Sequence, residues 1–149
     1  RIIVSNRAVQ RQQHIVPASR LNKIRGATMT QIMIVDDSPT DTHLLKKILE
    51  KNGFNTLTAA DAGAGIQVAK REKPDLILMD VVMPGLNGFQ ATRELSSDPD
   101  TSTIPVIIVT RKDQQVDRVW GMRQGARDYV TKPVKEGALM SLIKEALAA

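Results

Sequence analysis

The chain has 149 residues, of which 42% are hydrophobic and 25% charged, and it contains no cysteine. A chain of this length can bury one core, its composition is typical of a globular protein, and no apolar run approaches the roughly 20 residues of a membrane helix. The lack of cysteine excludes disulfides and thiolate metal sites and is compatible with a reducing cytoplasm, where we expect this protein.

The net charge of +5 is concentrated at the N-terminus. Residues 1–28 hold six of the 21 basic residues and no acid, which leaves 15 basic against 16 acidic residues in the remainder. An acid-free, Arg-rich segment suits a targeting peptide or a nucleic-acid arm, but we expect a leader or tail outside the core. The domain is expected at residues 29–149, and because this part is not basic we expect no nucleic-acid partner.

From Gln31 onward, apolar runs of strand length alternate with amphipathic helices. The first strand is expected at 31–35, and the helix after it has Asp37 or Ser38 as its N-cap and ends near Asn52. The other strands are expected at 54–58, 75–79, 104–110 and 127–131, and the other helices at 61–71, 86–96, 114–123 and 135–147. Strands that are apolar on both faces and alternate with helices predict an α/β fold, in which helices cover both faces of a five-stranded parallel sheet.

Polar residues stand where four of these strands end. Asp36 and Asp37 follow the first strand, Asp80 follows the third, Thr110 ends the fourth and Lys132 follows the fifth. In open parallel sheets, functional groups gather beyond the carboxyl ends of the strands. We therefore expect these side chains to lie together at one edge of the sheet.

The residue types at this edge indicate phosphoryl chemistry. Three crowded carboxylates repel one another unless a cation lies among them, and oxygen ligands without a Cys or His cluster favour Mg²⁺. Lys132 can donate to a phosphoryl oxygen and Thr110 offers a hydroxyl. A carboxylate in such surroundings can accept a phosphoryl group as an acyl phosphate, although an ion-paired edge that only stabilises the fold would contain the same residues.

Four motifs resemble the CheY-like receiver domains of bacterial two-component response regulators: IVDDSPT, LILMDVVMPGLNG, IPVIIVT and DYVTKPV. The resemblance implies a doubly wound, flavodoxin-like sheet with strand order 2-1-3-4-5. It also implies that Asp80 is the phosphoacceptor and that Asp36 and Asp37 bind Mg²⁺ together with Asp80 and the backbone carbonyl of Val82. Thr110 and Lys132 match the phosphoryl-binding positions, Tyr129 matches the aromatic switch that works with Thr110, and the Lys132-Pro133 bond matches a site that is usually cis.

A closer resemblance, through segments such as VWGMRQGARDYVTKPV, links the chain to PilH-type regulators of twitching motility in chemotaxis-like pathways. It implies a monomeric phosphoprotein that receives its phosphoryl group from a chemotaxis-type histidine kinase, catalyses the transfer and its slow hydrolysis itself, and is not otherwise an enzyme. The effector would bind the face formed by residues 114–147, without membrane insertion. Trp120, on that face, is expected to be a packing residue.

Three alternatives remain open at this point. The protein could drain phosphate from a sister regulator instead of contacting an effector. A Mg²⁺-dependent phosphatase of the haloacid dehalogenase type would need a second acid two residues after Asp80, where Val82 stands. A flavodoxin-type nucleotide site would need a Gly-rich or Ser/Thr-rich loop after the first strand, and the acidic DDSPTD there would repel phosphate without a metal.

Overall fold

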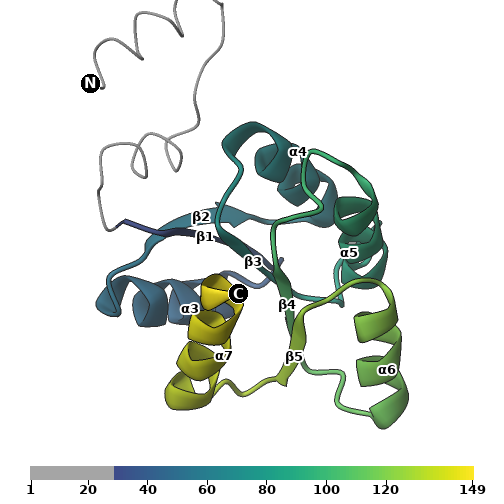
Figure 1. Cartoon of the computed structure of the whole chain (residues 1–149). Helices are drawn as coiled ribbons and strands as arrows, with labels where there is room; N and C mark the ends of the chain where they lie inside the picture. Colours follow the sequence, from purple (N-terminus) through teal and green to yellow (C-terminus); the bar gives the residue numbers. More distant parts are fainter. Residues whose placement is uncertain (1–28) are drawn as a thin grey trace, which may run out of the picture.

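The computed structural model describes residues 29–149, in which five parallel strands form one sheet in the order β2-β1-β3-β4-β5 (Figure 1). This order and the helices on both faces confirm the predicted fold. The prediction for residues 1–28 lies outside the described residues. The strands are β1 (Gln31–Val35), β2 (Asn55–Ala59), β3 (Leu76–Met79), β4 (Val106–Thr110) and β5 (Asp128–Thr131), and the helices are α3 (Pro39–Lys51), α4 (Ala62–Glu72), α5 (Gly88–Ser97), α6 (Gln115–Arg123) and α7 (Glu136–Ala148).

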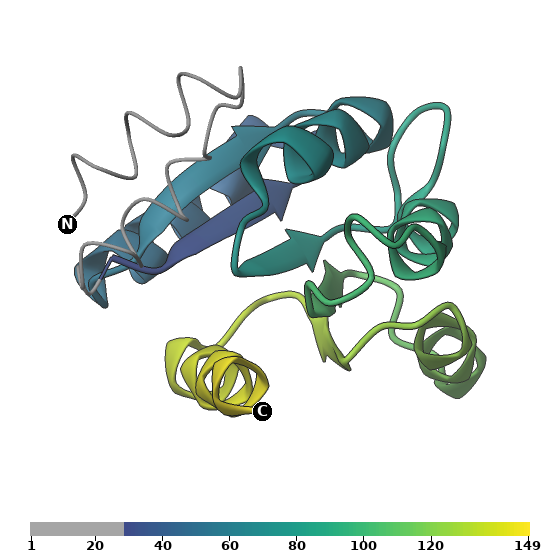
Figure 2. The ribbon, with the colours of Figure 1, turned by 45° about the horizontal axis from the view of Figure 1, so that its top comes forward.

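The alternation of side chains along the central strands divides the core into two layers. One face of the sheet packs against α3 and α7, and the other packs against α4 and α5, as the two views of the ribbon show (Figures 1 and 2). Ile32 and Ile34 of β1 belong to the first layer, while Met33 and Val35 belong to the second. All four are fully buried, which explains why these strands are apolar throughout.

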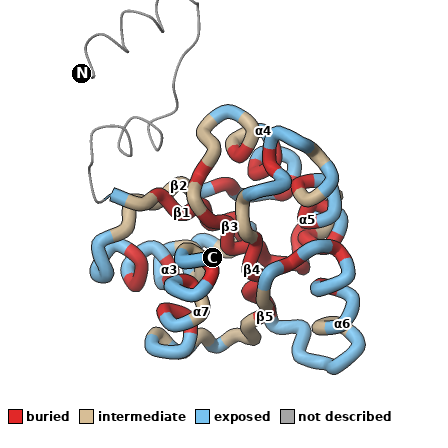
Figure 3. Tube along the Cα trace, in the orientation of Figure 1, coloured by how far each residue is buried: buried red, intermediate tan, exposed pale blue. Residues whose placement is uncertain are grey.

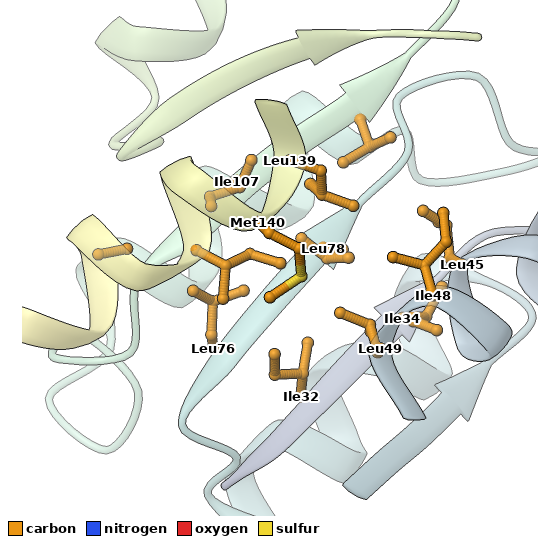
Figure 4. Packing of buried hydrophobic residues seen from close by; sticks show 13 residues of the cluster. Ile32, Ile34, Leu45, Ile48, Leu49, Leu76, Leu78, Ile107, Leu139 and Met140 are labelled. Carbon is orange, nitrogen blue, oxygen red and sulfur yellow. The ribbon is translucent and has the colours of Figure 1, made fainter. Parts of the chain in front are cut away.

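Burial is greatest in the middle of the sheet and decreases toward the outer sides of the helices (Figure 3). Between α3, α7 and the sheet, Leu45, Leu49 and Leu139 pack on residues of β1, β3 and β4 such as Leu78 (Figure 4). This core fixes the carboxyl ends of the strands relative to the start of α3. Within the described part of the chain, no helix is long and apolar enough to cross a membrane.

Most element boundaries shift by one or two residues from the sequence prediction, and two of these shifts have clear local reasons. Strand β4 begins at Val106, two residues late, because Pro105 has no N–H to donate to a sheet ladder. Helix α5 begins at Gly88 because Asn87 and Gln90 form a reciprocal capping box, with hydrogen bonds of 2.9 and 3.0 Å. The loop that follows Asp80 is therefore closed by a well-defined helix start.

Candidate functional site

The sheet register brings the polar strand ends together at one edge. Val35 pairs with Met79, and the ladder continues one residue further, where the amide of Asp80 donates to the carbonyl of Val35 at 2.9 Å. On the other side, the amide of Lys132 donates to the carbonyl of Thr110 at 2.8 Å. Asp36, Asp80, Thr110 and Lys132 thus reach one edge through backbone pairing.

Three carboxylates at this edge form a compact cluster. Oxygen atoms of Asp36, Asp37 and Asp80 all lie within 4.8 Å of one another; Asp36 and Asp80 are buried and Asp37 is exposed. One oxygen of Asp36 accepts from the amide of Ser38 at 2.9 Å, and one of Asp80 accepts from the amide of Val81 at 2.7 Å. These bonds fix the carboxylates and leave lone pairs unused, so the donor set fits a hard divalent cation such as Mg²⁺.

Lys132 is the buried cation of the site. Its side chain is only 4% exposed, and Nζ lies 2.7 Å from Asp36, 2.9 Å from Asp41 and 3.3 Å from Asp80. Burial alone would lower the pKa of Lys132, but its hydrogen bonds to Asp36 and Asp41, together with the negative charges of Asp80 and Asp36, outweigh burial and raise that pKa. The pKa of Asp36 is also raised, because burial and the charge of Asp80 outweigh the bond to Lys132. Asp36, Asp41 and Asp80 therefore share one buried ammonium group.

Asp41 and Arg111 belong to this network. The sequence, in which Arg111 directly follows Thr110, predicts that Arg111 covers or pairs with the phosphoryl group, but it does not predict Asp41. Asp41 lies in the first turn of α3, and its carboxylate accepts from Arg111 at 2.8 and 3.4 Å and from Lys132 at 2.9 Å. The hydrogen bonds from Arg111 and Lys132 lower the pKa of Asp41 to about 2, so it is ionised at neutral pH. The spacing of Asp41, four residues after Asp37 at a helix start, is the signal that could have indicated it.

Thr110 and Tyr129 are connected through one backbone unit. Thr110 is fully buried, and the amide of Lys112 lies 3.5 Å from its hydroxyl oxygen. The hydroxyl of Tyr129 donates to the carbonyl of the same Lys112 at 2.6 Å, and the guanidinium of Arg118 lies 5.2 Å from the ring centroid. The ring is 5% exposed, and burial raises the pKa of Tyr129 to about 12. The Tyr129 ring therefore already points inward in this structure.

Three further predicted residues can be placed. Val82, two residues after Asp80, is 61% exposed. The Lys132-Pro133 peptide bond is cis.

The prediction that Trp120 packs in the core is wrong, because this residue is 48% exposed. The short helix α6 contacts the protein mainly through Gly121, which lies against Ile108 and Tyr129, and its larger apolar side chains face outward: Val116, Val119, Trp120 and Met122.

Comparisons with known proteins agree with this arrangement. Residues 32–144 match the family model described as the response regulator receiver domain. The chain is 60% identical over 120 residues to protein PilH of Pseudomonas aeruginosa, covering 80% of this chain and 99% of that protein. It is 38% identical to the response regulator PleD of Caulobacter vibrioides over 76% of this chain but only 25% of PleD.

A solved structure offers a similar fold with a metal present. It is the receiver domain of the sensor histidine kinase PA1611 from Pseudomonas aeruginosa, determined with a magnesium ion coordinated in its active site cleft. The similarity has a TM-score of 0.76 at 29% identity and covers 82% of this chain and all of that domain. The described chain thus has the fold of a signalling domain for which a magnesium-bound example exists.

Proposed function

Because this chain belongs to the response regulator receiver domain family, we propose that it takes a phosphoryl group from a histidine kinase onto Asp80. One observation carries this assignment. Oxygen atoms of Asp36, Asp37 and Asp80 lie within 4.8 Å of one another, and the Asp80 carboxylate also lies 3.3 Å from the buried ammonium of Lys132. A carboxylate nucleophile needs positive charge beside it to approach an anionic phosphoryl donor: Lys132 supplies one charge, and Mg²⁺ held by the carboxylates would supply the other.

The residues of the site have distinct roles in this transfer. A carboxylate oxygen of Asp80 attacks the phosphorus atom, the bond from phosphorus to the kinase imidazole nitrogen breaks, and the imidazole leaves with the electron pair. Asp36, Asp37 and the Val82 backbone carbonyl would join Asp80 in holding Mg²⁺, which supplies positive charge for the phosphoryl oxygens. Lys132 would donate to one phosphoryl oxygen and the Thr110 hydroxyl to another. Hydrolysis of the acyl phosphate by water would then reset the protein.

The output surface proposed here is the face formed by α6, β5 and α7. The hydrogen bonds from Lys112 to Thr110 and from Tyr129 to Lys112 join the site to this face, so movement of the Thr110 hydroxyl toward a phosphoryl group would perturb Tyr129. The exposed apolar side chain of Trp120 lies on the same face and suits a protein contact. The similarity to PilH suggests that the pathway is a chemotaxis-like one that controls twitching motility.

Phosphotransfer from a chemotaxis-type kinase tests this proposal. The kinase is first labelled on its phosphohistidine, purified and mixed with the protein in the presence of Mg²⁺. We expect the label to move to the wild-type protein and to remain on the kinase when the Asp80→Asn variant is used. Equal transfer to both proteins would refute Asp80 as the acceptor.

The same experiment separates the two proposed outputs. If a sister regulator is added, a phosphate sink will drain its label through the kinase, and the total label will fall faster than with the sister regulator alone. A regulator that acts on an effector will instead retain its label and bind that effector more tightly when phosphorylated. A phosphatase of the haloacid dehalogenase type would turn over free phosphomonoesters, which we do not expect because Val82 replaces the acid that this chemistry requires.

A further inference from the structure

Asp41 has the geometry of a residue that competes with a phosphoryl group for the cations of the site. It accepts hydrogen bonds from Lys132 at 2.9 Å and from Arg111 at 2.8 Å, whereas the bond from Lys132 to the acceptor Asp80 is longer, at 3.3 Å. The Asp41 side chain is 14% exposed, so water screens its charge only partly. Lys132 and Arg111 are thus both engaged by a carboxylate that is neither the acceptor nor a proposed metal ligand.

The position of Asp41 on the helix makes this competition persistent. The amide of Asp41 donates to the Ser38 hydroxyl, which caps α3 and fixes the first helical turn beside the site. The backbone of Lys132 is held from the other side, where its amide donates a hydrogen bond to the Thr110 carbonyl. A phosphoryl group on Asp80 must therefore draw the ammonium away from a carboxylate that does not itself move away.

We propose that Asp41 is a positioning residue that retains Lys132 and Arg111 and thereby weakens their hold on a phosphoryl group bound to Asp80. This inference rests on the proposed phosphoacceptor function. It implies that neutralising Asp41 strengthens phosphoryl retention, the opposite of what is expected for a residue that merely orients Lys132 for binding. It also implies that Arg111 protects the phosphoryl group by neutralising Asp41.

Beryllofluoride, which mimics the phosphoryl group without undergoing transfer, tests the proposal on the full chain. With Mg²⁺ held at saturation, Asp41→Asn is expected to lower the Kd for beryllofluoride by roughly three- to tenfold, as for loss of a partly buried competing charge. Arg111→Gln is expected to raise the Kd, because Asp41 is then neutralised by Lys132 alone. The acyl phosphate lifetime should change in the same order, longest in Asp41→Asn.

Matched measurements separate this effect from a general change in charge or folding. Asp113→Asn removes an acid from the loop of Arg111. Within residues 29–149, the ion pairs of Lys132 and Arg111 go to Asp36, Asp41 and Asp80 and not to Asp113, so the Kd of this variant should stay within twofold of the wild type. Asp41→Ser provides a second neutral variant if Asn lowers stability, which urea unfolding reports. The Mg²⁺ affinity is titrated separately without beryllofluoride.

The outcomes distinguish the inference from the function on which it rests. An unchanged or higher Kd in both neutral variants of Asp41 overturns the inference, and so does a Kd in Asp113→Asn that falls as far. A fall in Mg²⁺ affinity with no change in beryllofluoride binding at saturating Mg²⁺ would make Asp41 an outer acid of the metal site and also overturns it. If the wild type fails to bind beryllofluoride with Mg²⁺, the phosphoacceptor function itself falls.

Discussion

Replacing Lys132 with Met removes the cation that Asp36, Asp41 and Asp80 share, while a long side chain is kept. Breaking a buried ion pair by removing one partner costs about 3–5 kcal/mol, because the other charge remains buried. The variant can relieve this cost by protonating one carboxyl, which for an ordinary pKa of 3.8 costs about 4.4 kcal/mol at pH 7. We therefore expect its free energy of unfolding to be about 3–4 kcal/mol lower than that of the wild type at pH 7 without Mg²⁺.

The loss should shrink at pH 5, where the same protonation costs about 1.6 kcal/mol. Asp36 is expected to take this proton, since burial already raises its pKa when Lys132 is present. The pKa of Lys132 is raised in the folded protein, so its stabilising contribution is complete below its ordinary value of 10.5 and is lost only as the pH rises through the higher folded value. At both pH values the wild type therefore retains the full contribution of Lys132.

Urea unfolding followed by far-UV circular dichroism measures these differences. Lys51→Met is the matched control, because Lys51 pairs with Glu136 at 2.9 Å but the two side chains are 68% and 37% exposed. We expect this control to lie within about 0.5 kcal/mol of the wild type. A loss below about 1 kcal/mol for Lys132→Met at pH 7, or an equal loss at both pH values, would refute the account of Lys132 as the shared counter-charge.

Three further predictions concern the lifetime of the acyl phosphate, the packing after Asp80 and the N-terminal segment. Val82→Asn and Arg111→Ala should each shorten the acyl phosphate lifetime, because Val82 cannot hydrogen-bond the attacking water and Arg111 neutralises Asp41. The lifetime is measured as loss of label after the kinase is removed, and unchanged lifetimes in both variants would contradict this shielding. Gly88→Ala should lower the free energy of unfolding by about 3 kcal/mol or more, since a Cβ there would overlap the backbone carbonyl of Asp80. A Cβ at Gly137 meets no neighbour, so Gly137→Ala should be neutral or stabilising by up to about 1 kcal/mol, and similar losses in both variants would disprove the close approach at Gly88. Deleting residues 1–28 should change the free energy of unfolding by less than about 1 kcal/mol, and a larger loss would mean that the domain boundary is wrong.

The strand ends of the site could be predicted because strong local signals mark them. Runs such as LILM (76–79) are apolar on both faces, so an acid directly after them must stand at the edge of a buried parallel sheet. The rule that functional groups gather beyond the carboxyl ends of strands then joins Asp36, Asp80 and Lys132, although they are far apart in the chain. The sheet register places each of them where this rule predicts.

Residues that depend on helix orientation could not be predicted in this way. Asp41 is an acid in a first helical turn, where it is also expected simply because it complements the helix dipole. Only the packing of α3 against the sheet turns it toward Lys132 and Arg111. The prediction for Trp120 is wrong for a related reason. An apolar residue at helical spacing is normally buried, but α6 is short and its buried residue is Gly121, so Trp120 lies on the exposed side.

Mapping the phosphorylated residue tests the central claim most directly. The protein is incubated with acetyl phosphate, with and without Mg²⁺, and the modified peptide is identified by mass spectrometry after chemical trapping of the acyl phosphate. We expect one phosphoryl group, on Asp80, that forms only with the divalent cation and is absent from Asp80→Asn. Full phosphorylation of the Asp80→Asn protein, or modification of the wild type at a residue outside this edge of the sheet, would contradict it.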